Sequence, residues 1–411
     1  MYERLKLITM HHISERYNLA LLPAAVFLLS LPFTHTVALR LLSLSIAVAI
    51  TLFTWRSRST PPIPFKLPLV LWAGIAVLSL TWASNPYFSM GEIKNEIVYT
   101  MLTFVVFYSM TKGKNEWEFF VRVVKLGFLG ISISGILGYW LARDKWDMGG
   151  LHGGVGDFST YLITILPFLL YSAITVPLSK FPKNLVWLLL PILVLGGYLT
   201  LNRAFWPALI STSIVFGFLY TIRFHPSQAR KRILVGSLVV GLLAFTQFVD
   251  VVKQKARQAG SDSEILTKTI EEDPRILIWK FAIENIKQNP LTGFGFGRGA
   301  MGQAFKNHFV EKQYLHAHNL LLNYALQMGI GGVLALLILL GAIAREFWQL
   351  YRAPDSYTCS IGIVGLSLLS GFIIKNMTDD FFLRQHALLF WAMIGMTLGY
   401  GRRHLLAKTR T

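Results

Sequence analysis

Residues 319–344 read NLLLNYALQMGIGGVLALLILLGAIA, a run without a single charged side chain. A helix needs about 20 predominantly apolar residues to cross the hydrocarbon core of a bilayer. An irregular backbone facing lipid could not satisfy its hydrogen bonds, so a spanning segment of this kind has to be helical. The run therefore predicts a membrane-spanning helix.

The same pattern recurs along the whole chain. Of the 411 residues, 54% are hydrophobic and 15% are charged, whereas soluble domains carry about 25% charged residues. The sequence predicts an all-α polytopic membrane protein with about twelve transmembrane helices, each near the length that spans a bilayer. The predicted spans are 18–34, 37–55, 67–83, 97–111, 119–142, 158–178, 184–201, 204–222, 233–250, 319–344, 357–374 and 385–400.

The positively charged residues of the chain are distributed unevenly among the predicted loops. A net charge of +18 would suggest a nucleic-acid partner in a soluble protein. Here the lysines and arginines concentrate in alternate short loops and near both termini, which is the positive-inside pattern. We therefore expect both termini in the cytoplasm and no nucleic-acid partner. Basic residues of these loops include Arg56, Arg58, Lys112, Lys114, Lys180 and Lys183.

One long external connection divides the predicted spans. Residues 251–317 form a large loop between helices 1–9, within 1–250, and helices 10–12, within 318–411. Loops of this length are usually functional or disordered. The predicted organisation is therefore nine spans, a large periplasmic loop and three further spans.

The loop itself contains a helical pattern, DPRILIWKFAIENIKQNP, at residues 273–290. Asp273 suits a helix N-cap and Pro274 the first helical position. Apolar side chains recur at helical spacing along one face. We expect an amphipathic helix that lies on the membrane surface or caps a cavity. The apolar positions are Ile276, Trp279, Ile283 and Ile286.

Four short motifs follow one another along the chain. In order, they are LTWASNPYFS at 80–89, TLNRA at 200–204, Arg275 with Trp279, Ala282, Ile286 and PLTGFG at 290–295, and His318-Asn319 nine residues before Gly329-Ile-Gly-Gly332. Together with the large external loop before the His-Asn span, they resemble the O-antigen ligase and O-antigen polymerase superfamily of bacterial envelope glycosyltransferases. TLNRA departs from the family in having Asn202 where serine is usual.

The resemblance implies a reaction and a place for it. A glycan carried on undecaprenyl pyrophosphate would be transferred to an acceptor hydroxyl at the periplasmic face of the bacterial inner membrane, without a metal or another cofactor. The fold would resemble the C-type glycosyltransferases. In ligases the acceptor is a sugar of lipid A–core, and a single large external loop favours a ligase over a polymerase. A relative that transfers the glycan to protein stays open.

A lipid or sugar transporter is the alternative of a different class. A transporter would need polar or charged groups deep inside several spans. The predicted spans carry their charges near their ends, and charged groups gather on the external side. The sequence therefore favours an enzyme that acts at the membrane surface.

His318 is the predicted catalytic base. The acceptor hydroxyl must lose its proton as it attacks the anomeric carbon, and an imidazole accepts protons near neutral pH. His318 opens the 319–344 run, which places it at the water boundary, where it could also be a simple interfacial polar residue. Gly329 lies about 16 Å further along a continuous helix. We therefore expect the glycines to allow close helix packing instead of contacting the substrate.

Arg275 and Arg203 are the predicted partners of the pyrophosphate. A guanidinium group stays charged and binds phosphate oxygens bidentately. Arg275 falls in the first turn of its predicted helix, where free backbone N–H groups favour anions, unless a neighbouring carboxylate pairs with it. Arg203 stands between two apolar segments, where a charge is costly and indicates function. The competing carboxylates are Glu271, Glu272 and Asp273.

Five further polar residues are predicted to bind substrate. His316 can contact substrate or orient Asn319, and Arg298 in GFGFGRG is a further phosphate candidate. Asp379 and Asp380 lie in the last external loop, NMTDDFFLR. Either could orient His318 as its carboxylate partner, bind the acceptor sugar, or be a solvated loop residue.

A metal site is not expected. His308, His316 and His318 could form a zinc site by composition, but no ligand set with metal spacing follows. The Asp-x-Asp motif that holds a metal in many glycosyltransferases is missing from the sequence. Positive charge for the leaving group can come from the arginines themselves.

Overall fold

The computed structural model describes most of the chain as helices joined by turns. The residues that it describes contain no β-strand. They divide into two compact units, which are taken separately below. The described residues are 19–55, 61–143, 145–146, 149–175, 186–224, 274–309 and 316–409, with isolated positions between 236 and 246.

The first unit comprises Met1–Pro62, Tyr99–Gly154 and Leu388–Thr411. Glycines let α16 approach α5 closely: a Cβ atom at Gly395 would lie 2.7 Å from the carbonyl oxygen of Phe104, on the α5 backbone. Arg403 fixes the same pair of helices by donating to the carbonyl oxygen of Tyr108 at 2.7 Å. Its helices are Leu19–Ser30, α2 (Val37–Phe53), α5 (Tyr99–Met110), α6 (Lys114–Leu141) and most of α16 (Arg384–Thr409).

The second unit comprises Ile63–Val98 and Val155–Ala387 and holds every residue of the site described below. Its helices are α3 (Lys66–Leu78), the 3₁₀ turn η1 (Ser79–Thr81), α4 (Pro86–Ile93), the π-helical turn η2 (Lys94–Val98), α7 (Val155–Thr175), α8 (Val186–Leu199), α9 (Phe205–Phe224), α12 (Pro274–Gln288), α13 (Gly302–His308), α14 (Leu320–Tyr351) and α15 (Ser356–Met377).

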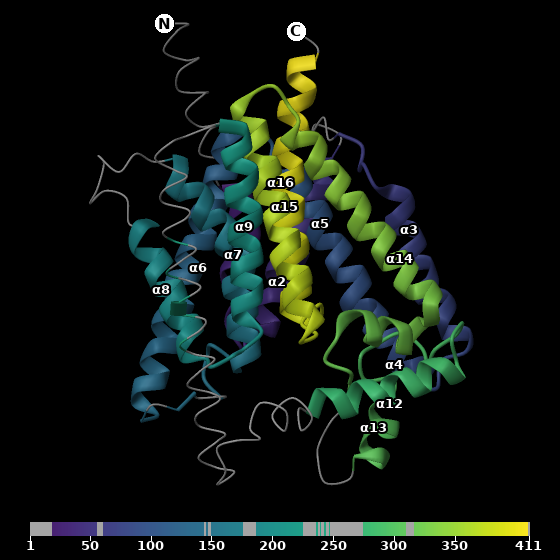
Figure 1. The fold of residues 1–411 in the computed structure, drawn as a ribbon. Helices are drawn as coiled ribbons and strands as arrows, with labels where there is room; N and C mark the ends of the chain where they lie inside the picture. The colour runs from purple at the N-terminus through teal and green to yellow at the C-terminus, as the bar shows by residue number, and fades with distance from the viewer. Residues whose placement is uncertain are drawn as a thin grey trace, which may run out of the picture. The chain divides into compact units, whose positions relative to one another are not determined.

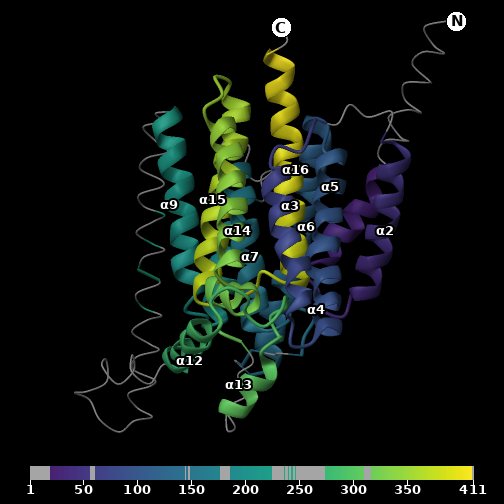
Figure 2. The ribbon, with the colours of Figure 1, turned by 90° about the vertical axis from the view of Figure 1, so that its right-hand side faces the viewer.

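Helix α15 is the centre of this unit, with α7, α9 and α14 packed against it (Figures 1 and 2). The contact with α9 is close because Gly371 has no side chain and makes room for Thr212. At the directly preceding positions, the hydroxyl groups of Ser211 and Ser370 are 2.6 Å apart. Small residues and hydroxyl pairs are the usual means of joining helices in lipid.

Five described helices are long and apolar enough to cross a membrane: α6, Val155–Ile174 of α7, α9, α14 and α15. Shorter apolar helices are Leu19–Ser30, Val37–Phe53, Lys66–Thr81 and Leu188–Leu199. The prediction of an all-helical, multi-pass membrane protein is therefore confirmed at the level of fold class. The predicted span 97–111 is only the 12 residues of α5. Most of the predicted span 233–250, and residues 251–273 of the predicted loop, fall outside the described residues.

The predicted helix in the large loop is α12, and it begins at Pro274 as expected. It lies across the end of α14 instead of alongside it (Figure 1). Its buried face is rotated from the predicted one, because Ile278 and Ala282 are buried whereas the side chain of Ile283 is 42% exposed. That face packs on Phe305 of α13 and on the loop that precedes α14. The loop region thus has a small core of its own.

Candidate functional site

The site is built around His318, which directly precedes Asn319, the N-cap residue of α14. His318 has a φ of +51°, a left-handed conformation that costs a non-glycine residue about 1–3 kcal/mol. Neighbouring bonds hold it there. Asn323 accepts from the backbone N–H of Ala317 at 2.8 Å, and the indole of Trp279 donates to the carbonyl oxygen of Ala317 at 2.8 Å.

Asn319 caps α14 and ties it to the end of α15. Its side-chain oxygen accepts from the backbone N–H of Leu322 at 3.0 Å, and its amide nitrogen donates to the carbonyl oxygen of Met377 at 2.8 Å. Both polar atoms of the amide are thus engaged within the protein. This arrangement accounts for the Asn of the His-Asn motif as the residue that sets the position of the histidine.

Asp379 is the carboxylate that faces His318. Its Oδ1 lies 3.4 Å from Nδ1 of the imidazole, and its Oδ2 lies 3.4 Å from Nζ of Lys375. Burial raises the pKa of Asp379, but the hydrogen bond from His318 and the charge of Lys375 outweigh it, and the pKa falls to about 2. The carboxylate is therefore ionised. With Nδ1 directed at Asp379, Nε2 is the ring nitrogen that does not face this carboxylate.

The ring of His316 lies against the same imidazole, tilted by 40°, with the two ring centroids 3.9 Å apart. Burial, and then the positive charge of Arg298, lower the pKa of His316 to about 2. His316 is therefore a neutral ring beside His318. The two histidines do not share a helix face, because both precede the helix.

Asp380 bonds to Asn323 and Arg298 instead of to His318. Its Oδ2 accepts from the amide of Asn323 at 2.5 Å, and its backbone oxygen accepts from Arg298 at 2.5 Å. Burial raises its pKa, which the charge of Arg298 partly opposes. Of the two acidic residues that sequence analysis could not separate, the structure brings only Asp379 to the histidine.

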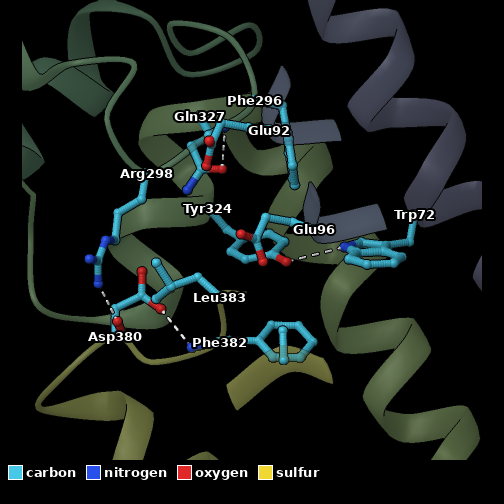
Figure 3. Close-up of a pocket in the computed structure, with 12 residues that line it drawn as sticks. Trp72, Glu92, Glu96, Phe296, Arg298, Tyr324, Gln327, Asp380, Phe382 and Leu383 are labelled. Carbon is cyan, nitrogen blue, oxygen red and sulfur yellow. Dashed lines mark hydrogen bonds between the residues drawn. The ribbon is translucent and has the colours of Figure 1, made fainter. Parts of the chain in front are cut away.

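Arg298 and Asp380 border a small cavity of about 20 Å³ (Figure 3). The cavity has aromatic walls, including Trp72 and Tyr324, whose indole nitrogen and hydroxyl group are 3.3 Å apart. Further lining residues are Glu92, Glu96, Phe296, Gly297, Gln327, Phe382, Leu383 and Ala387.

Two buried glutamates of this cavity were not predicted from the sequence. Glu92 and Glu96 both bind Arg384, whose Nη2 lies 2.6 Å from Oε1 of Glu92. Burial raises the pKa of Glu96 to about 7, against the opposing effect of the backbone N–H and guanidinium group of Arg384. The available signal was a pair of acidic residues four positions apart just before an apolar run.

The two predicted arginines lie at the same end of the second unit. Arg275 precedes Trp279 by one turn of α12, and its charge contributes to the low pKa of Asp379. Arg203 is exposed at the start of α9. It stands eight residues before Ser211, which contacts Ser370, and Asp379 stands nine residues after Ser370.

The departure from the family at Asn202 has a local role. The amide nitrogen of Asn202 donates to the hydroxyl of Ser159 at 3.0 Å, and its oxygen accepts from the backbone N–H of Ala204 at 2.9 Å. Asn202 therefore ties the turn that carries Arg203 to α7. The predicted competitors of Arg275, at 271–273, fall outside the described residues.

The glycine motif joins a loop to a helix, which corrects its predicted role in helix packing. Gly329 has a φ of +64°, and α14 is broken at Met328 and Gly329. The PLTGFG loop bonds to the opened turn: Phe294 N–H donates to Leu326 at 2.8 Å, and Ile330 N–H donates to Pro290 at 2.8 Å. A Cβ at Gly329 would lie 2.6 Å from the Pro290 oxygen.

The described residues contain no group of three or more His, Cys, Asp or Glu side chains placed to hold a metal ion. Of the three histidines considered for zinc, His308 instead stacks on Phe281, with centroids 4.2 Å apart. His316 and His318 face each other.

Comparisons with known proteins match part of this chain to one family model and to one curated relative. The family model described as O-antigen ligase matches residues 187–337. The chain is also similar to a General O-oligosaccharyltransferase of Acinetobacter baylyi, with 25% identity over 199 residues, which cover 45% of this chain and 33% of that protein. The resemblance to the O-antigen ligase superfamily is thus confirmed, and the matched segment contains Arg203, Arg275 and His318.

Proposed function

We propose that this protein is a glycosyltransferase that moves an O-antigen glycan from undecaprenyl pyrophosphate to a sugar hydroxyl of lipid A–core. The reaction would take place at the periplasmic face of the bacterial inner membrane, with both termini in the cytoplasm. The pairing of His318 with Asp379, inside a site that the O-antigen ligase match reaches, carries the proposal. Membrane lipids surround the enzyme, and both substrates carry lipid anchors in the same membrane.

His318 acts as the general base. As the acceptor oxygen attacks the anomeric carbon, Nε2 takes the hydroxyl proton. The bond between that carbon and the pyrophosphate oxygen breaks, and undecaprenyl pyrophosphate leaves with the bonding electrons. Asp379 accepts the Nδ1–H bond, holds the imidazole in this tautomer and stabilises the imidazolium that forms.

Arg275 and Arg203 stabilise the departing pyrophosphate. Charge develops on its oxygens in the transition state, and preorganised guanidinium groups are worth most there. The two side chains come from α12 and from the α8–α9 turn, so they can approach the diphosphate from different directions. With this charge supplied by the protein, the transfer proceeds without a metal ion or another cofactor.

Arg298, Asp380 and His316 form the substrate-binding surface next to the base. Arg298 links the cavity to Asp380 and approaches His316. A sugar hydroxyl or a phosphate of either substrate can be bound by this set. Asn319 contributes by fixing the loop that carries His318.

Transfer to protein is the second candidate, and the similarity to the Acinetobacter baylyi General O-oligosaccharyltransferase favours it. An O-antigen polymerase would use the same donor with a lipid-linked glycan as acceptor. The three activities share the donor half of the site and differ in the acceptor.

Deletion of the gene in its host separates the three. Loss of a ligase leaves bare core, and polymerised glycan accumulates on the lipid carrier. Loss of a polymerase leaves core with one repeat unit, and loss of a protein transferase leaves lipopolysaccharide unchanged but removes protein glycosylation.

The base assignment is tested in the same strain. Expression of His318→Ala should reproduce the deletion phenotype, at membrane protein levels equal to those of the wild type. Retained transfer by this variant would end the assignment of His318 as the base. Transfer by the purified wild type should also persist in excess chelator.

A further inference from the structure

Lys375 is a fully buried charge next to the site. It lies in the last turn of α15, four residues before Asp379, and its side chain has 0% exposure. A buried ammonium group is costly unless it is paired. Its Nζ lies 3.4 Å from Oδ2 of Asp379 and 5.1 Å from the centroid of the Phe381 ring. The absence of a side chain at Gly156 makes room for that ring.

Charged groups from several elements surround this pair. Two groups act on Asp379. The imidazole of His318 comes from the loop before α14, and the charge of Arg275 comes from α12. Lys375 also interacts with Arg275 and with Asp157 from α7. Asp157 is in turn bound by His386, whose Nε2 is 3.0 Å away. Asp380 adds a carboxylate from the same loop as Asp379, and the His316 ring lies against the His318 ring.

The carboxylate of Asp379 is therefore shared between two partners, one for each oxygen. Oδ1 faces His318, and Oδ2 faces Lys375. Rotation of the carboxylate would break both contacts together. Because Lys375 is fully enclosed, it has no surface with which to touch a substrate.

We propose that Lys375 is a positioning residue, which binds one oxygen of Asp379 so that the other stays aimed at Nδ1 of His318. This inference rests on the proposed function, in which His318 is the base. It adds Lys375 to the His318–Asp379 pair and gives this buried lysine a role in the proposed reaction.

Lys375→Met tests the idea, because methionine has a similar length and no charge. Without the ammonium group, burial acts on Asp379 with less opposition, so the carboxyl binds a proton at higher pH. A protonated Asp379 no longer accepts the Nδ1–H bond of His318, so the acid limb of the kcat profile moves upward.

The assay uses purified enzyme, a synthetic undecaprenyl-pyrophosphate oligosaccharide and purified lipid A–core. We expect Lys375→Met to lower kcat about tenfold at neutral pH, to move the acid limb up by about one pH unit, and to leave the KM for the donor unchanged. Lys375→Arg, which keeps the charge, should return the limb toward its wild-type position. A uniform loss at every pH, with the limb unmoved, would show a merely structural role and overturn the inference.

A double variant provides the second criterion. If Lys375 acts through Asp379, then Lys375→Met in an Asp379→Asn background should cause little further loss, whereas independent roles would give losses that multiply. If Lys375→Met does not insert, Lys375→Gln replaces it, since glutamine keeps an N–H donor without the charge.

A readout without turnover separates this inference from the proposed function. The rate of His318 carbethoxylation is measured against pH, with His318→Ala as the background. The reaction at neutral pH should be slower in Lys375→Met than in the wild type, and an equal rate overturns the inference about Lys375. Full activity of His318→Ala would instead overturn the assignment of His318 as the base in the proposed function.

Discussion

The indole nitrogen of Trp279 donates a hydrogen bond of 2.8 Å to the backbone carbonyl oxygen of Ala317, the residue before His318. This bond joins α12 to the loop that presents the imidazole. Arg275 lies one turn from Trp279 on the same helix face. The bond thus couples the position of the proposed base to that of a proposed pyrophosphate ligand, and it explains why a tryptophan belongs to the arginine motif.

Trp279→Phe should therefore reduce transfer without unfolding the protein. Phenylalanine keeps the apolar contact but loses the donor, so the loop that carries His318 can shift, and displacements of about 1 Å can cost up to about 100-fold in rate. We expect kcat to fall about tenfold or more. Transfer assays on membranes with matched protein levels measure the effect. Lys280→Ala on the exposed side of α12 is the control, and an equal loss there would contradict the explanation.

Gly329→Ala should destabilise the joint between the PLTGFG loop and α14. A Cβ at this position meets the Pro290 oxygen at 2.6 Å, and the φ of +64° disfavours alanine as well. We expect a loss of at least about 1–3 kcal/mol, seen as a lower melting temperature in detergent. Gly331→Ala is a matched control two residues away, where a Cβ has nothing within 4 Å. If the two variants melt alike, the joint does not depend on Gly329.

Glu96 makes stability depend on pH in the neutral range. Its pKa is raised from 4.5 to about 7, so the folded state binds the proton more tightly than the unfolded state. Its contribution to the unfolding free energy is fully present below pH 4.5, and it is lost as the pH rises through 7. The total change is about 3 kcal/mol. In Glu96→Gln, the denaturant midpoint of unfolding should depend less on pH between pH 5 and pH 8. If the midpoint changes with pH as steeply as in the wild type, the pH dependence does not come from Glu96.

Arg275→Lys separates charge from geometry in the leaving-group site. Lysine keeps the positive charge but cannot bind two phosphate oxygens in the fork geometry of arginine. We expect kcat/KM for the lipid-linked donor to fall about tenfold or more, with Arg275→Ala lower still. Single-turnover release of undecaprenyl pyrophosphate reports this directly. Wild-type rates in Arg275→Lys would mean that Arg275 contributes only its positive charge and not a bidentate contact with the phosphate.

The sequence was sufficient for the class of fold and for the helices that carry periodic patterns. The 319–344 run is part of α14, and α12 begins at Pro274, because apolar spacing and proline position act locally. The break at Gly329 was not foreseen, since the helix opens only to meet a loop that lies 34 or more residues earlier in the chain.

The site was foreseen only in part for the same reason. His318 and Asp379 were both candidates, but their pairing depends on the fold, which brings together positions 61 residues apart. Lys375 directly follows the predicted span 357–374, where it resembles an ordinary flanking lysine of a helix end. Its burial and its partner could not be inferred from that position. Glu96 pairs with Arg384 across 288 residues, a separation that no local pattern reveals.

The opened turn at Gly329 explains why a fixed number of residues separates His318-Asn319 from the glycines of the motif. Nine residues separate Asn319 from Gly329, the point where α14 is clamped to the preceding loop. Inserting one residue into that interval would turn the imidazole about 100° around the helix axis relative to the clamp. We therefore expect the length of this interval to set the direction of the His318 side chain relative to the clamp at Gly329.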